Sequence, residues 1–204
     1  CALPILMITI NPNGLDNWIE MLDTFPDRAR EAMAIAINQT AKREAAKSIR
    51  DDMLKHVNLK KGYLIKNTPV HAFATKNKLK ATITARDTPT MLARYAMNRT
   101  RIPKRQKGVK VQVKRGSIKN MKSAFLVDFS GKSRTNVALM VRTKNGQPPH
   151  GVTHDGARYV KSMNAWILYA PSIDQLMWSV AGQNEAKITR ALEREFLRQF
   201  ALRK

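Results

Sequence analysis

The chain has 204 residues, and 43% of them are hydrophobic, which is enough to bury a core and excludes wholesale disorder. Its formal net charge is +22, so an anionic partner is expected. The sequence contains no apolar run near the ~20 residues that a membrane-spanning helix requires, and its single cysteine cannot form an intrachain disulfide, which is typical of a reducing compartment.

Residues 1–13 are expected to be an N-terminal extension or arm. Leu3–Ile10 is apolar and β-branched enough for a short strand. We interpret Met7 as the natural first residue and residues 1–6 as an upstream extension. The alternative is a processed lipoprotein whose mature form begins at Cys1.

Residues 14–204 are expected to form a single domain that begins with helices. Apolar residues recur at helical spacing in Leu15–Leu22, and Thr24 with Asp27 resembles a capping box at a helix start. A long helix with one apolar stripe should follow. The members of the stripe are Ala29, Met33, Ala36, Ile37, Ala41, Ala45, Ile49 and Met53. A further short helix is predicted over Lys60–Asn67, where it ends before a proline.

The middle of the chain changes to period-two alternation and to short, dense apolar runs, both typical of strands. The predicted strands are residues 81–86, 109–113, 124–129, 137–141 and 166–170. A loop is predicted over Asn145–Asn164, and helical spacing returns at Ile173–Val180 and Ile188–Phe200, with Gly182 as a break. The sequence therefore predicts an α+β fold, an antiparallel sheet of several strands flanked by a long N-terminal helix and C-terminal helices.

One segment of the chain is strongly basic. Between Asp87 and Asp128 the sequence has no acidic residue but eleven basic ones, and ten of these fall between Arg99 and Lys122. Like charges gathered in this way repel one another unless an anion neutralises them. The ten candidate anion-contacting or DNA-contacting residues are Arg99, Arg101, Lys104, Arg105, Lys107, Lys110, Lys114, Arg115, Lys119 and Lys122.

The strand predicted over residues 109–113 would orient these charges. Its valines should face inward, so Lys110 and Lys114 should share the outer face, after an exposed loop over residues 99–107. No aromatic residue lies between Arg99 and Lys122, which disfavours stacking on single-stranded bases. Two kinds of contact remain: contact with the backbone of a nucleic-acid duplex, without sequence preference, and contact with an acidic protein.

Few residues point to catalysis. His150, His154 and Asp155 are the only cluster with metal-ligand residue types, and prolines and glycines around them argue against a helix that would bring them together. We interpret them as polar loop residues, with a metal-dependent nuclease as the alternative. Trp166, Tyr169 and Trp178 are interpreted as core residues. We expect no catalytic residues, no metal site and no cofactor.

Several segments follow one another in an order and spacing that resemble a known family. They are Leu92-Ala93-Arg94-Tyr95, residues 107–113, Arg115-Gly116, Ser123–Leu126, Val141-Arg142-Thr143 and Leu168–Ile173. Over about residues 14–204 the chain is similar to the minor tail protein Z, or tail completion protein, family of long-tailed bacteriophages. Two features depart from that pattern: Ala170 stands where such proteins often carry glycine, and the loop over residues 145–164 is longer than usual.

The resemblance implies a structural virion protein and not an enzyme. Such proteins complete the head-proximal end of the tail, are expected to form a homo-oligomeric ring (a hexamer), and help join the tail to the head connector. Assembly in the host cytoplasm is implied. The expected partners are other copies of the chain, tail terminator or tail tube proteins, head-tail connector proteins and the end of the packaged genomic DNA, with no membrane.

Our hypothesis is that Arg99–Lys122 faces the lumen of such a ring or a neighbouring ring, where it contacts DNA backbone or acidic neighbours. In a ring of identical subunits the +22 charges would repel one another, so an anion at the centre or an acidic neighbouring ring is expected. A sequence-nonspecific nucleic-acid-binding protein of the host and the metal-dependent nuclease are the alternative functions.

Overall fold

A computed structural model describes residues 7–10, 24, 26–97, 102, 107–130, 136–149 and 156–203. The chain divides into two compact units, both of which fall largely within the region expected to be a single domain. The helical unit comprises residues 1–53, 61–87 and 174–204, and the sheet unit comprises residues 54–60 and 88–173. Within the described ranges, no helix is both long enough and apolar enough to cross a bilayer.

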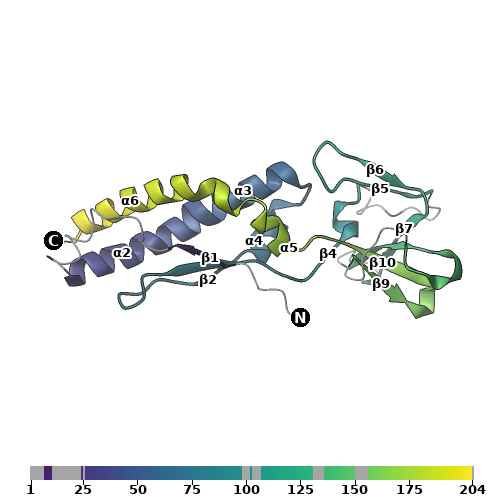
Figure 1. The fold of residues 1–204 in the computed structure, drawn as a ribbon, viewed down its shortest axis with the longest axis horizontal. Helices are drawn as coiled ribbons and strands as arrows, with labels where there is room; N and C mark the ends of the chain where they lie inside the picture. The colour runs from purple at the N-terminus through teal and green to yellow at the C-terminus, as the bar shows by residue number, and fades with distance from the viewer. Residues whose placement is uncertain are drawn as a thin grey trace. The chain divides into compact units, whose positions relative to one another are not determined.

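The helical unit combines helices with a small antiparallel sheet (Figure 1). Its elements are β1 (Met7–Ile10), α2 (Pro26–Thr40), the π-helical η2 (Ala41–Ala45), α3 (Ala46–His56, whose last residues belong to the sheet unit), α4 (Lys61–Asn67), β2 (Val70–Ala72), β3 (Ala81–Thr84), α5 (Ile173–Trp178), the 3-10 turn η7 (Ala181–Asn184) and α6 (Glu185–Ala201). The central strand β3 pairs with β1 on one edge and β2 on the other, both antiparallel.

The long helix predicted from the apolar stripe is confirmed as α2, η2 and α3 in succession. Every member of the predicted stripe, from Ala29 to Met53, is at most 1% exposed. Residues spaced four apart drift by about 40° per step on a regular α-helix. The wider turn of η2 at Ala41–Ala45 reduces that drift and holds the stripe on one face.

Helix α6 runs alongside α2 (Figure 1) and is joined to the long helix by polar contacts near both of its ends. The Arg28 guanidinium donates a 2.8 Å hydrogen bond to the Phe200 carbonyl oxygen and lies 4.4 Å from the centre of that ring. Near the other end, the Lys187 ammonium donates to the Ser48 hydroxyl at 2.8 Å. These contacts and the buried Phe196 fix α6 in register with the long helix.

The short helix predicted over Lys60–Asn67 is confirmed as α4, and its C-terminus is held by α3. Arg50 donates to both the hydroxyl and the carbonyl oxygen of Thr68, and the Thr68 hydroxyl donates to the Leu64 carbonyl at 2.7 Å. Burial lowers the pKa of Arg50 from its ordinary value. The fork of the guanidinium thus satisfies groups that the helix end would otherwise leave unpaired.

The sheet unit is built almost entirely of antiparallel strands. Its elements are β4 (Thr90–Met91), the 3-10 turn η3 (Leu92–Tyr95), β5 (Val109–Val111), β6 (Lys119–Met121), β7 (Ala124–Asp128), β8 (Val137–Val141), the 3-10 turn η4 (Lys144–Gly146), β9 (Ala157–Val160), the 3-10 turn η6 (Lys161–Met163) and β10 (Ala165–Ala170). One sheet has the order β4-β10-β8-β7, with β9 also paired to β10, and β5 and β6 form a separate hairpin.

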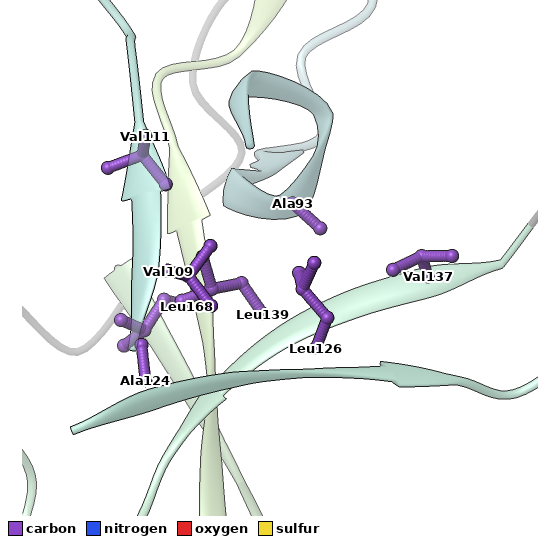
Figure 2. Close-up of a cluster of buried hydrophobic side chains, with 8 residues drawn as sticks. All are labelled: Ala93, Val109, Val111, Ala124, Leu126, Val137, Leu139 and Leu168. Carbon is purple, nitrogen blue, oxygen red and sulfur yellow. The ribbon is translucent and has the colours of Figure 1, made fainter. Parts of the chain in front are cut away.

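The core of the sheet unit lies on both faces of its larger sheet. Figure 2 shows the cluster on one face, to which η3, β5, β7, β8 and β10 contribute. Its members are Ala93, Val109, Val111, Ala124, Leu126, Val137, Leu139 and Leu168. A second buried cluster contains Ala138, Met140, Ala165 and Ile167. Because alternate residues of β8 enter different clusters, its sequence is continuously apolar rather than alternating.

The α+β class, the long N-terminal helix and the C-terminal helix are confirmed. Two expectations are wrong. Strand β9 lies within the region expected to be a loop, where Ala157–Val160 pairs with β10. Trp178, expected in the core, is 59% exposed. Of the predicted arm, β1 confirms a strand at Met7–Ile10, while residues 3–6 and the helix expected over Leu15–Leu22 lie outside the described residues.

Candidate anion-binding surface

The hairpin of β5 and β6 carries the described part of the basic segment. Its register pairs Val109 with Met121, Lys110 with Asn120 and Val111 with Lys119. Val109 and Val111 are buried and Lys110 between them is exposed, so the outward orientation predicted for Lys110 is confirmed. Lys119 pairs with the buried Val111. Because directly paired residues lie on the same face of a sheet, the Lys119 side chain is on the inner face of the hairpin.

The second edge of β5 is also hydrogen-bonded, so the backbone that carries these lysines is fixed on both sides. The Met97 amide donates to the Lys110 carbonyl at 3.0 Å, and the Gln112 amide donates to the Tyr95 carbonyl at 2.9 Å. Strand β5 ends at Val111, two residues earlier than predicted. The prediction that Lys114 shares the outer face of the strand is therefore wrong.

Beyond the strand, the chain is held by the segment that follows α3. The Asn58 amide donates to the Val113 carbonyl at 3.0 Å, and Lys114 forms an isolated antiparallel bridge with Val57. The chain then turns: the Ser117 amide donates to the Lys114 carbonyl at 3.2 Å. Gly116 occupies the third position of this turn with φ of +80°, a value that glycine adopts without strain.

Gly108 sets the open end of the hairpin. Its φ is +88°, and a Cβ at this position would lie 2.8 Å from the Met121 carbonyl oxygen and 2.9 Å from the Lys122 Cα. Both obstacles are backbone atoms, so no side-chain movement could relieve the contact. Glycine is therefore required at this position for β6 to approach β5 so closely.

Substituting Gly108→Ala should lower the free energy of unfolding by about 1–3 kcal/mol, because it adds left-handed strain and a backbone clash. The measurement is urea unfolding followed by circular dichroism. Gly62→Ala is the matched control: a Cβ there meets no atom within 4 Å in α4, so it should be neutral or stabilise by up to about 1 kcal/mol. Equal effects of the two substitutions would contradict this account of the hairpin.

The structure places six of the ten candidate residues. Lys107, Lys110, Lys114, Arg115, Lys119 and Lys122 are all exposed. Arg99, Arg101, Lys104 and Arg105 lie outside the described residues, as does most of the loop expected over residues 99–107. None of the six forms an ion pair with an acidic residue in the described part of the chain.

Five of these six cations fall into two groups that the sequence did not distinguish. The outer group consists of Lys110 on the exposed face of β5 and of Lys107 and Lys122, which flank the close backbone contact at the open end. The inner group consists of Lys114 and Lys119, which both line a pocket on the valine side. Arg115 lies in the turn between β5 and β6.

The pocket has a volume of about 390 Å³, and its described lining residues are Val111, Val113, Lys114, Ser117 and Lys119. Its lining combines the valines of β5 and its continuation with two lysines and one serine. Beside it, Ile118 is 53% exposed. Sequence reasoning missed Ser117 and Ile118, because Lys119–Met121 carries no apolar alternation that would have indicated a second strand.

The histidine cluster cannot be placed in the same way. His150, His154 and Asp155 all lie outside the described residues. In the ranges that the structure does describe, no three histidine, cysteine or acidic side chains are grouped so that they could hold a metal ion. The nuclease alternative therefore stays a prediction about residues beyond those ranges.

The arrangement on the hairpin supplies ammonium and guanidinium donors on a fixed backbone, and such donors bind phosphate or carboxylate oxygens. The outer group is open to solvent, as contact with a large polyanion requires. The inner group borders an apolar pocket. Comparison of the chain with models of known families, with curated proteins and with solved structures gives no match.

Proposed function

We propose that this chain is a structural virion protein that completes the head-proximal end of a phage tail and helps join the tail to the head connector. The proposal rests on the resemblance described above. All segments that carry it lie in the sheet unit, within residues 92–173. They supply most of the cluster in Figure 2, namely Ala93, Val109, Val111, Ala124, Leu126 and Leu168.

The observation that carries the proposed mechanism is the outer group of exposed cations with no acidic partner among the described residues. In a ring of identical subunits, each with a charge of +22, repulsion between neighbours is screened only beyond about 8 Å. An anion therefore stabilises the assembly. The end of the packaged DNA is such an anion, and lysine contacts to its phosphates need no particular sequence.

The proposed partners are other copies of the chain in a ring, tail terminator or tail tube proteins and connector proteins. The role is a non-catalytic one in the virion. Hydrophobic residues exposed on the helical unit, including Trp178 at 59% and Leu197 at 51%, offer apolar surface for contacts of this kind.

Interrupting the gene in the virus that encodes the chain tests this function. We expect filled heads and separate tails that fail to join, loss of infectious particles, and recovery when the intact chain is supplied in trans. A reconstruction of complete particles should then place the chain at the head-proximal end of the tail. Infectious, joined particles that lack the chain would overturn the proposal. Recovery of the chain with ribosomes or chromatin of uninfected cells would instead support a host nucleic-acid-binding protein.

A further inference from the structure

We propose that the pocket beside the β5–β6 hairpin binds a carboxylate-bearing, partly apolar segment of a partner protein. This inference rests on the proposed function, because it supplies a protein contact for the same assembly. It concerns the inner group of cations, Lys114 and Lys119, and not the outer group assigned to DNA.

The pocket has the size and lining of a peptide subsite. Ligand pockets commonly measure about 300–1,000 Å³, and the volume of about 390 Å³ here is at the small end of that range. Val111 is only 3% exposed and forms part of the core, so its side of the pocket is fixed by packing. Val113 is partly exposed and held through its carbonyl by the Asn58 amide. A side chain that enters would therefore meet a preformed apolar surface.

The charges around the pocket favour an acidic occupant. Lys119 lies opposite Val111 in the hairpin register, and Lys114 and Ser117 are joined by the hydrogen bond of the turn, so all three approach from one end of the hairpin. Neither lysine has an acidic partner among the described residues. A carboxylate at this point would accept charge-assisted hydrogen bonds from the ammonium groups and a further one from the Ser117 hydroxyl.

The apolar surface distinguishes a protein from DNA as the occupant. A phosphate backbone presents oxygens and charge, and it gains little from a valine-lined pocket. A protein segment can bury an aliphatic or aromatic side chain there while its carboxylates meet the lysines. Ile118, which follows the pocket residue Ser117, is 53% exposed, and exposed apolar residues beside a pocket are typical of protein-binding surfaces.

The probes for the test are three hexapeptides with blocked ends. The first, Asp-Leu-Glu-Phe-Asp-Leu, has both the charge and the apolar side chains. The second, Asn-Leu-Gln-Phe-Asn-Leu, lacks the charge, and the third, Asp-Ser-Glu-Ser-Asp-Ser, lacks the apolar groups. Titration calorimetry with the full chain should detect binding of the first peptide, and binding at least tenfold weaker for each of the other two.

Matched variants locate the binding. Lys114→Gln with Lys119→Gln should weaken binding of the first peptide roughly five- to thirtyfold, as expected for the loss of two exposed ion pairs. Val113→Thr keeps the shape of the side chain and adds a hydroxyl. It should weaken binding of the first peptide and leave binding of duplex DNA unchanged. Lys107→Gln with Lys110→Gln removes the same charge from the outer group, so it should leave peptide binding within about twofold.

Three results would overturn the inference. The first is no binding of the acidic, apolar peptide to the wild-type chain. The second is equal weakening by both lysine pairs, which indicates only general attraction to a basic protein. The third is displacement of the peptide by a short DNA duplex, together with an equal loss of duplex binding in the variant Lys114→Gln with Lys119→Gln. That result would make the pocket a DNA site. If particles that lack the chain are joined and infectious while the first peptide still binds the pocket, the proposed function is refuted and the assignment of the pocket stands.

Discussion

Replacing Lys107, Lys110 and Lys122 together with glutamine should weaken binding of a duplex oligonucleotide by roughly 500-fold at 0.1 M salt. Each lysine that neutralises a phosphate contributes about 0.9 to the slope of log affinity against log salt, because counterions are released. Three such contacts contribute about 2.7 to the slope, which corresponds to roughly 500-fold at 0.1 M. The three side chains are exposed and have no acidic partner among the described residues, so their removal should leave the fold intact.

The measurement is fluorescence anisotropy with two unrelated duplexes between 50 and 300 mM salt, conditions in which contacts of this type dominate. Lys66, Lys78 and Lys161 are exposed and lie outside the hairpin, so their replacement with glutamine removes the same charge and forms the control. The hairpin variant should lose slope equally for both duplexes, and the control should keep it. An unchanged slope in the hairpin variant, or an equal loss in both variants, would remove DNA from the proposed function.

The elements that could be predicted from the sequence are those whose buried residues recur at a regular apolar spacing within one segment. The stripe from Ala29 to Met53 repeats every three to four residues, and the structure buries all of it. Strand β8, Val137–Val141, was predicted with its exact ends because both of its faces are buried, which makes its whole sequence apolar. In both cases a single segment carries the information that decides its structure.

The elements that were missed are strands that pair with a neighbouring strand but lack apolar alternation of their own. Lys119–Met121 has no apolar alternation and becomes a strand because its backbone pairs with β5. Ala157–Val160 lies between turn-forming residues and becomes a strand because it pairs with β10. Backbone hydrogen bonds between paired strands require no apolar alternation in either segment, so hydrophobic periodicity could not indicate these two strands.

The candidate site shows the same division. The exposure of Lys110 follows from strand alternation and was predicted correctly. The position of Lys114 was predicted wrongly, because β5 ends at Val111 and Lys114 instead forms a bridge with Val57. The pocket depends on residues before and after the turn at Gly116, so no single motif indicated it. The sequence therefore predicted a basic surface, and the structure divides it into two groups with different surroundings.

The fixed position of these groups depends on the cluster in Figure 2, and Leu139→Ala should lower the free energy of unfolding by about 3–5 kcal/mol. Leu139 is fully buried on β8, so its truncation removes apolar contacts and leaves a cavity in a packed core. Urea unfolding measures the loss. Leu197→Ala is the control: this leucine is 51% exposed on α6, and its truncation should change stability by less than about 1 kcal/mol.

Hydrogen exchange tests whether the effect of Leu139→Ala reaches the basic hairpin. Val109 and Val111 of β5 belong to the same cluster, so a cavity there weakens the support of the strand that carries Lys110. The amide protons of β5 that pair with β6 should exchange faster in Leu139→Ala than in the wild-type chain, and Leu197→Ala should leave their rates unchanged. A loss of stability below about 1 kcal/mol, or unaltered exchange in β5, would show that the hairpin is held by its backbone hydrogen bonds and not by this core.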